Sequence, residues 1–290
     1  MSVPPPLKAF VTRFAPSPTG LLHRGHAFSA LTAFEAARAA GGRLLLRIED
    51  IDTARCRPRF EAAIVEDLAW LGVEWEPPPR RQSEHLADYR AALARLEARG
   101  LIYRCFKTRA QVLADIGRAP HGPTAAYRGA PLGPAEEARL TAEGRPFAWR
   151  LSLAAAERAL DGISGLTFTE EGAGPNGETG RIAARPERAG DVILARKGLG
   201  VAYHLAVVVD DALQGVSHVI RGADLFDAAH IHRLLQALLA LPTPIYRHHR
   251  LLLDDDGQRF AKRDRAETLR DLRARRLSAA ALRAELGFQI

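Results

Sequence analysis

The sequence predicts an α/β fold with a doubly wound parallel sheet, and three observations indicate it. An apolar strand at residues 9–15 is followed by a tight loop, a long helix at 23–40 and a second apolar strand at 43–50. A strand, a loop at a helix start and a second strand beside the first form half of a nucleotide-binding sheet. The 290 residues are about twice a typical domain, and 47% of them are apolar, so the chain can bury a large core.

Composition excludes several other classes of protein. No uncharged apolar run approaches the length of a membrane span, and residues 1–10 lack the apolar stretch of a signal peptide. Cys56 and Cys105 are the only cysteines, so no disulfide framework is possible. We therefore expect a cytoplasmic protein without a membrane partner. The 41 basic and 34 acidic residues give a net charge of +7, which suits a polyanionic partner, although a solvated basic C-terminal tail is the simpler alternative.

The remaining elements follow in chain order. Periodicity predicts helices at 58–72 and 83–100, a strand at 101–106 and a short helix that Thr108 and Gln111 open as a capping box. The segments 118–134 and 172–190 are rich in Gly, Pro and Ala, with short β-like pieces between them. Ordered segments then return at 191–196, 201–209 and 217–221, before a helix at 225–241 and a hairpin at 251–260.

These elements divide the chain into three parts. We predict a Rossmann-like catalytic domain in two halves, 8–104 and 191–256, with an inserted α+β subdomain at 105–190. Residues 257–290 form a loop and a short, basic helical tail.

The segment PSPTGLLHRGH at residues 16–26 carries the strongest local signal. Its prolines hold the loop extended, while Gly20 and Gly25 remove side chains where a flat base could approach the backbone. His23 and His26 are three residues apart at a helix start, so both face one side near the positive end of the helix dipole. We interpret the segment as a nucleotide triphosphate site; the alternative is two surface histidines on a first helical turn.

Two further segments are candidates for ligand contact. RIEDID at residues 47–52 places an arginine and three acids at the carboxyl end of the second strand, which faces the ligand crevice of an open α/β sheet. RFAKRD at 259–264 contains Lys262, one of only four lysines among 41 basic residues, and a lysine can close over phosphates as a compact charge. Taken singly, a surface turn and a basic surface loop remain the alternatives.

Together, these motifs resemble those of class I aminoacyl-tRNA synthetases. PSPTGLLHRGH is similar to the HIGH signature of that class, and FAKRD is similar to its KMSKS loop. RFAP at residues 13–16, RIEDID, and AYHLAVVVDDALQGVSHVIRGADL at 202–225 resemble the glutamyl-tRNA synthetase branch. The resemblance covers the whole chain, although only weakly across about 105–190. It implies a HIGH-type catalytic domain.

The end of the chain departs from that branch. Only 26 residues follow Asp264, whereas a full glutamyl-tRNA synthetase continues into a large anticodon-binding region. The truncation resembles the members that act on the queuosine base of tRNA(Asp). That resemblance implies ATP-dependent, tRNA-independent activation of L-glutamate to glutamyl-adenylate, followed by transfer of glutamate to queuosine. We expect such an enzyme to be a monomer.

The resemblance also implies roles for individual residues. The glutamate would be contacted by Arg13, Phe14, Ala15, Pro16, Ser17, Glu49, Tyr203 and Arg221. Glu49 would accept the ammonium group, and Arg13, with Arg221 as its helper, would read the side-chain carboxylate and so select glutamate over glutamine. The ATP would be contacted by His23, Gly25, His26 and Lys262, of which the two histidines and the lysine are the catalytic candidates. The substrate carboxylate is itself the nucleophile, so catalysis needs positioning and charge stabilisation, with Mg²⁺ expected on the triphosphate. Without the resemblance, Tyr203 would be interpreted as a core aromatic and Arg221 as a surface ion pair.

The resemblance also bears on zinc. Many relatives bind zinc in the insertion through a Cys-x-Cys pair, a tyrosine and a further cysteine. Cys105 and Tyr127 occupy two of these positions, but Lys107 and Pro131 occupy the others and offer no suitable donor. Because zinc needs about four N, S or O ligands, we expect no zinc and a half-buried, apolar Cys105. Replacement by His121 is a weaker alternative.

Three functions remain open on the sequence alone. The first is glutamate transfer to a modified base, and the second is a truncated glutamyl-tRNA synthetase that charges a tRNA 3′ end. The third is a non-catalytic RNA-binding paralogue, or a nucleotidylyltransferase of the same fold. The intact Arg13, His23, His26, Glu49 and Lys262 argue against a non-catalytic paralogue. The amino-acid pocket argues against a nucleotidylyltransferase.

Overall fold

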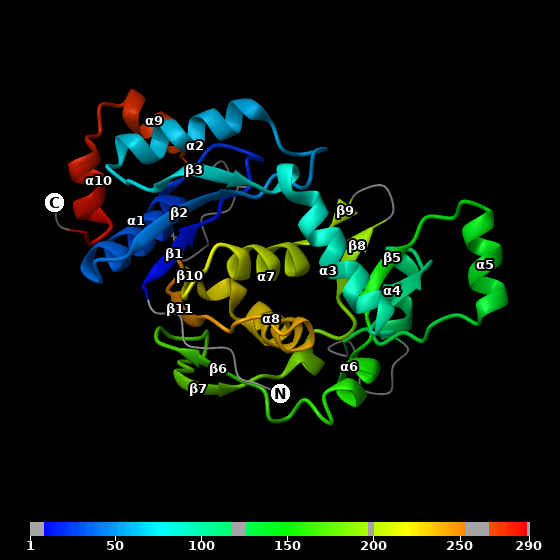
Figure 1. Ribbon diagram of the computed structural model, residues 1–290. Helices are drawn as coiled ribbons and strands as arrows, with labels where there is room; N and C mark the ends of the chain where they lie inside the picture. Colours follow the sequence, from blue (N-terminus) through cyan, green and yellow to red (C-terminus); the bar gives the residue numbers. More distant parts are fainter. Residues whose placement is uncertain (1–8, 118–125, 197–199, 253–266, 289–290) are drawn as a thin grey trace.

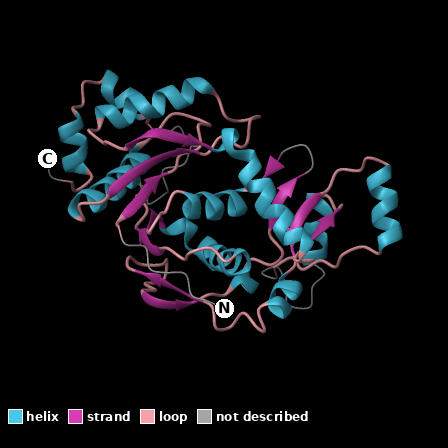
Figure 2. Cartoon of the chain, viewed as in Figure 1, coloured by secondary structure: helices cyan, strands magenta, loops and turns pink. Residues whose placement is uncertain are grey.

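The computed structural model describes residues 9–117, 126–196, 200–252 and 267–288, and Figures 1 and 2 show how their helices and strands are arranged. The N-terminal strands form a parallel sheet in the order β1-β2-β3, with bounds β1 Val11–Phe14, β2 Arg43–Ile48 and β3 Glu76–Arg81. Helix α1 (Arg24–Ala39) connects the first two strands, as the sequence predicts.

A second group of strands continues on the other side of β1. It consists of β10 (His218–Gly222), β11 (Ile245–His249), β6 (Thr167–Glu170) and β7 (Gly180–Ala183), in that order. Only the last pair is antiparallel. The N–H of Ser217 donates to the carbonyl of Val11 at 2.9 Å, so β10 begins beside the first strand of the chain. The predicted α/β fold with a parallel sheet is confirmed.

Helices cover both faces of this sheet, because alternate residues of its strands point in opposite directions. Phe14, Leu44 and Leu46 pack with α1, α2, α9 and α10 on one face. Val11 and Leu45 point to the other face and pack with α8. The bounds of these and the neighbouring helices are α2 Pro58–Trp70, α3 Leu86–Ala98, α7 Tyr203–Leu213, α8 Phe226–Leu239, α9 Leu269–Ala274 and α10 Ala279–Glu285. None of the described helices is long and apolar enough to cross a membrane.

A smaller sheet lies to the right of α3 in Figure 1. Its strands are β4 (Ile102–Cys105), β5 (Ala148–Leu151), β8 (Ile193–Arg196) and β9 (Gly200–Val201), all antiparallel. The helices of this stretch of chain are α4 (Arg109–Gly117), α5 (Pro134–Ala142) and α6 (Leu153–Ala159). Strand pairing crosses the predicted boundaries at 105 and 190, because β5 pairs with both β4 and β8, while β6 joins β11. The division into catalytic and inserted parts stays a prediction.

Three elements differ from the predicted ones. β3 contains three consecutive prolines, which argue against a strand, but it lies at the sheet edge, where proline is tolerated. β11 has too many polar residues for a predicted core strand, yet its alternate residues Tyr246 and His248 are buried. Most of the segment 201–209, predicted only as ordered, belongs to helix α7. The predicted hairpin at 251–260 lies almost entirely outside the described residues.

Candidate active site

A cavity of about 500 Å³ lies where β1, β2 and β10 end. It is lined by every described residue that the sequence predicts to bind glutamate or ATP: Arg13, Phe14, Ala15, Pro16, Ser17, His23, Gly25, His26, Glu49, Tyr203 and Arg221. The fold therefore brings together side chains that are up to 208 positions apart in sequence, from Arg13 to Arg221. Lys262, the remaining candidate, lies outside the described residues.

The two histidines of the cavity cap helix α1. His23 is the N-cap residue, and its Nδ1 accepts a hydrogen bond from the N–H of Gly25 at 3.1 Å. The N–H of His23 in turn donates to Nδ1 of His26 at 3.2 Å. An Nδ1 that accepts a hydrogen bond carries no proton, so the proton of each neutral ring is on Nε2. The helix start thus holds two imidazoles as donors at a terminus that favours anions.

Described residues on both sides of the segment 253–266, which contains Lys262, lie at this cavity or at the start of α1. Leu252, immediately before the undescribed segment, lines the cavity. After that segment, Thr268 forms a β-bridge with His23, and the N–H of Leu269 donates to the carbonyl of Leu22 at 2.8 Å. The described residues that flank this segment therefore lie at the cavity and at the start of α1.

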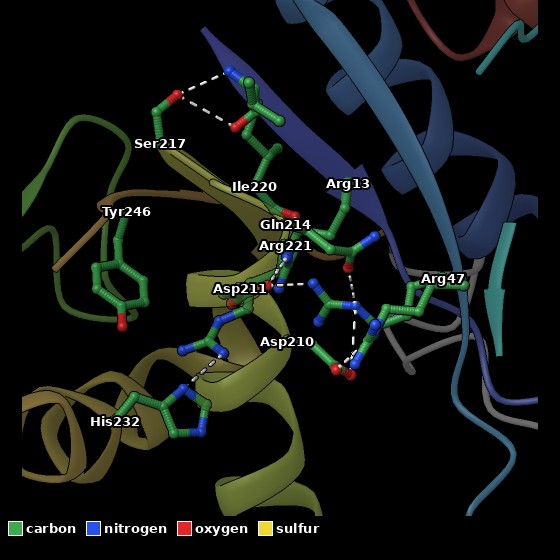
Figure 3. A network of polar contacts seen from close by, with 12 residues as sticks. Arg13, Arg47, Asp210, Asp211, Gln214, Ser217, Ile220, Arg221, His232 and Tyr246 are labelled. Carbon is green, nitrogen blue, oxygen red and sulfur yellow. Dashed lines mark hydrogen bonds and ion pairs between the residues drawn. The ribbon is translucent and has the colours of Figure 1, made fainter. Parts of the chain in front are cut away.

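Arg13 is held by a carboxylate of helix α7. Its Nε donates to Oδ1 of Asp211 at 3.1 Å, and its Nη1 donates to the carbonyl of Ile220 at 3.3 Å (Figure 3). Arg47 of β2 donates from Nη2 to the same Asp211 oxygen at 2.5 Å, and from Nε to Gln214 at 2.9 Å. Burial alone would raise the pKa of Asp211, but the two guanidinium groups outweigh it and lower that pKa. Asp211 is therefore a shared counter-ion.

The neighbouring Asp210 fixes α7 against the elements around it. Its carboxylate is fully buried and accepts hydrogen bonds from Arg80 at 2.7 Å, from Gln82 at 2.8 Å and from the hydroxyl of Tyr89 at 2.9 Å. These donors precede or belong to α3. The position of Asp211 beneath the cavity therefore depends on a second buried network on the same helix.

Arg221, at the carboxyl end of β10, has a different set of partners. Its Nε donates to Nε2 of His248 at 3.0 Å, and its Nη2 donates to the carbonyl of Leu225 at 2.9 Å. Its Nη1 lies 3.4 Å from Nδ1 of His232 (Figure 3). The same Nη1 lies 3.3 Å from the hydroxyl of Tyr203. Arg221 is only 5% exposed, and no carboxylate of the described chain forms an ion pair with it.

Glu49, which directly follows β2, is one of two acidic residues that line the cavity, with Asp224. Burial raises its pKa to about 7, although the guanidinium groups of Arg47 and Arg13 oppose the rise. Its side chain accepts no hydrogen bond from the described residues, whereas its N–H donates to the carbonyl of Pro16 at 3.1 Å. A carboxylate without protein donors inside a cavity is suited to accept a cationic group of a ligand.

Sequence reasoning missed five side chains that support this site. These are Glu170, Asp210, Asp211, His232 and His248. The sequence holds one signal for Asp210 and Asp211: two acids interrupt the apolar run AVVVDDAL, so both need partners once that helix is buried. Glu170, His232 and His248 left none, since their partners are distant in sequence.

The positions predicted for zinc do not form a metal site among the residues that the structure describes. The Sγ of Cys105, which is buried rather than half-buried as predicted, lies 3.8 Å from the hydroxyl of Tyr127. Lys107 donates to Asp115 at 2.6 Å instead of facing a metal. No group of three or more His, Cys, Asp or Glu side chains suited to a metal occurs in the described ranges, which leave out His121. The residues present therefore do not fit zinc, and its absence stays a prediction.

The parallel sheet, the histidine-capped helix and the cavity beside them define the catalytic domain of a class I aminoacyl-tRNA synthetase. The chain belongs to the family described as "tRNA synthetases class I (E and Q), catalytic domain", which matches residues 9–154 and 175–281.

Curated relatives narrow this assignment. The chain is 50% identical to a glutamyl-Q tRNA(Asp) synthetase of Rhodobacter capsulatus, over 96% of this chain and 99% of the relative. It is 44% identical to a protein of the same name from Symbiobacterium thermophilum, over 90% of this chain and 80% of that one. A glutamate–tRNA ligase of Prochlorococcus marinus is 36% identical, but the match covers only 56% of that protein.

Solved structures agree on the fold. A glutamate tRNA ligase from Elizabethkingia meningosepticum, crystallised with its amino acid, has a TM-score of 0.72 at 27% identity. The match covers 89% of this chain and 52% of that ligase, so the chain spans about half the length of the solved relative. A methionyl-tRNA synthetase of Mycobacterium tuberculosis has a TM-score of 0.58 at 13% identity, over 96% of this chain and 64% of that one, and shares the fold.

Proposed function

We propose that this chain is a glutamyl-Q tRNA(Asp) synthetase: it activates L-glutamate with ATP and transfers it to the queuosine base of tRNA(Asp). The observation that carries the proposal is that the carboxylate of Glu49, the guanidinium groups of Arg13 and Arg221 and the two helix-capping imidazoles all line one cavity. The proposed acceptor, the queuosine base of tRNA(Asp), follows from the names of the relatives, because the match to the glutamyl-Q tRNA(Asp) synthetase of Rhodobacter capsulatus covers 99% of that protein.

The charged groups of the cavity suit glutamate. In the proposed complex, Glu49 accepts the ammonium group of the substrate, and Arg221 pairs with its side-chain carboxylate beside the hydroxyl of Tyr203. Asp211 pairs with both Arg13 and Arg47, and Arg47 also lies 3.7 Å from a carboxylate oxygen of Asp210, so the charge of Arg13 is largely balanced before substrate binds. Nη2 of Arg13 makes no hydrogen bond within the described ranges and can still donate to a substrate oxygen. Ser17 and the backbone of residues 14–16 complete the wall.

The other end of the cavity suits ATP. The Nε2–H groups of His23 and His26 would donate to phosphate oxygens at the start of α1, and Gly25 leaves the backbone accessible there. The α-carboxylate of glutamate then attacks the α-phosphorus in line, the bond to the bridging oxygen breaks, and pyrophosphate leaves with the electron pair. Lys262 would stabilise the departing charge, and Mg²⁺ would arrive bound to the triphosphate.

Two assays test this function in sequence. ATP–pyrophosphate exchange with L-glutamate should proceed without tRNA, and strict dependence on added tRNA would contradict the tRNA-independent step. Labelled glutamate should then transfer to tRNA(Asp) that contains queuosine, and not to the same tRNA lacking it. Mild periodate, which oxidises the cyclopentene diol of queuosine preferentially, should abolish transfer. Retention of acceptor activity after that treatment would instead favour charging of a 3′ end.

A further inference from the structure

The partners of Arg221 are all electrically neutral where they contact it. The guanidinium group donates to two imidazole nitrogens and a backbone carbonyl and contacts one hydroxyl, and its ring neighbour Tyr246 lies 5.4 Å away in a cation–π contact. A buried arginine ordinarily pairs with a carboxylate, as Arg47 does at Asp211. Arg221 thus retains its full positive charge while five contacts fix the plane of its fork.

The hydrogen bonds also fix the protonation of both histidines. Since Nδ1 of His232 accepts from Arg221, its proton is on Nε2, which lies 3.2 Å from Nδ1 of His204. Burial lowers the pKa of His232 well below its usual value. Burial, and to a lesser extent the charge of Arg221, lowers the pKa of His204 to about 4. Both rings are therefore neutral at physiological pH.

His248 is held in the opposite tautomer. Its Nε2 accepts from Arg221, so its proton is on Nδ1, which donates to Glu170 at 2.6 Å. Glu170 also accepts from the N–H of His248 at 2.8 Å, and both side chains are fully buried. The carboxylate nearest in this network is thus one imidazole removed from Arg221. It orients the ring that contacts the guanidinium group without contacting that group itself.

We propose that His232 and His248 are positioning residues that orient Arg221 without neutralising its charge. Because both imidazoles are neutral, the charge of Arg221 stays available to the substrate and sets the preference of the cavity for glutamate over glutamine. The inference rests on the proposed function, in which Arg221 pairs with the side-chain carboxylate of the substrate. A substrate carboxylate is then the first anion to reach Arg221, and it forms two parallel N–H···O bonds. An amide offers one acceptor and presents its own donors, so it leaves the charge unbalanced.

A matched pair of variants at position 232 separates charge from shape. Asparagine in His232→Asn places a neutral acceptor near the position of Nδ1, and aspartate in His232→Asp has the same shape with a negative charge. Exchange should be measured for each with L-glutamate and with L-glutamine, reporting KM and kcat separately. His230→Asn and His230→Asp are controls, because His230 is buried on the same helix but bonds to the N–H of Arg185 rather than to Arg221.

We expect His232→Asp to raise KM for glutamate and to lower the ratio of kcat/KM for glutamate over glutamine by about tenfold or more, the factor that corresponds to about 1.4 kcal/mol. His232→Asn should keep that ratio within about threefold of wild type on the same scale, whatever its overall activity, and neither His230 variant should change it. Equal ratios in His232→Asp and His232→Asn would overturn the proposal. Absence of exchange with glutamate in the wild type would instead contradict the proposed function.

Thermal unfolding keeps the test decisive if a variant is unstable. A carboxylate at position 232 should pair with Arg221, so His232→Asp should melt cooperatively, and glutamate should raise its melting temperature less than it raises that of His232→Asn. If His232→Asp and the longer His232→Glu both fail to fold while His232→Asn and His232→Gln fold, Arg221 does not accept a counter-ion there, and the proposal is wrong.

Discussion

Arg13 and Arg221 both line the base of the cavity, but different elements hold them. Helix α7 supplies Arg13 with a carboxylate that Arg47 shares (Figure 3), whereas α8 and β11 supply Arg221 with the imidazoles of His232 and His248. The same type of side chain therefore serves two purposes. Around Arg13 the charges are balanced within the protein, which stabilises the fold. Around Arg221 one charge is left for a ligand, which costs stability in the empty protein.

The largest effect on stability should come from removing the carboxylate of Asp211, which balances the charges around Arg13. Asp211→Asn keeps the shape but leaves Arg13 and Arg47 buried without their shared counter-ion. Breaking a buried pair in this way costs about 3–5 kcal/mol of unfolding free energy. Urea unfolding of wild type and variant at pH 7 measures it. A loss below about 1 kcal/mol, the value of an exposed pair, would mean that the network does not stabilise the fold.

Sequence reasoning predicts the residues that belong to recognisable motifs, but it misses the side chains that hold those residues in place. Arg13, Glu49 and the capping histidines belong to short segments whose residue types already indicate chemistry. Asp211 contacts Arg13 across 198 positions and Glu170 contacts His248 across 78, so only the folded chain brings these pairs together. β3 and β11 were missed for a related reason, because their places in the sheet, and not their composition, permit prolines at an edge and histidines in the core.

The second effect concerns selectivity and decides between the two arginines. If Arg221 recognises the side-chain carboxylate, Arg221→Ala should lower the glutamate-to-glutamine ratio of kcat/KM by about two to four orders of magnitude, equivalent to about 3–5 kcal/mol. Arg13→Ala should lower activity and stability but preserve more of that ratio, because Asp211 already balances Arg13. The sequence alone favours Arg13 as the main reader of the carboxylate. A larger loss of the ratio in Arg13→Ala would support that prediction and reverse the comparison.

Glu49 gives a third, pH-dependent effect. Its folded pKa of about 7 lies above its ordinary value of 4.5, so the empty fold favours the protonated form, and that stability is lost as the pH rises from about 4.5 through 7. Substrate binding has the opposite sign, because only the ionised carboxylate pairs with an ammonium group. KM for glutamate should therefore fall by about tenfold per pH unit as the pH rises toward 7, and it should level off above pH 7. Glu49→Gln should raise KM and flatten this profile between pH 5.5 and 8.

A profile that stays unchanged in Glu49→Gln would assign the titration to another group. Asp50→Asn is a suitable control, since Asp50 follows Glu49 in sequence but accepts hydrogen bonds from the N–H and the hydroxyl of Ser83. It should shift stability without moving the midpoint of the KM profile. The pair of variants thus separates a ligand-facing carboxylate from a neighbour that the protein already satisfies.

The smallest effect should come from an ion pair at the rim of the same cavity. Arg55 lines the cavity and donates from Nε to Asp52 at 2.6 Å, but the two side chains are 73% and 39% exposed. The hydrogen bond from Arg55 lowers the pKa of Asp52, so the pair contributes stability above the ordinary pKa of an aspartate and loses it as the pH falls through the lowered value. Water screens such a pair, and Asp52→Asn should cost less than about 1 kcal/mol in the urea experiment that tests Asp211→Asn.

Half-molar salt should reduce even that difference, whereas it should leave the cost of Asp211→Asn nearly unchanged. Equal costs for the two variants would mean that burial does not distinguish the carboxylates, and the contrast between the balanced floor of the cavity and its exposed rim would fail.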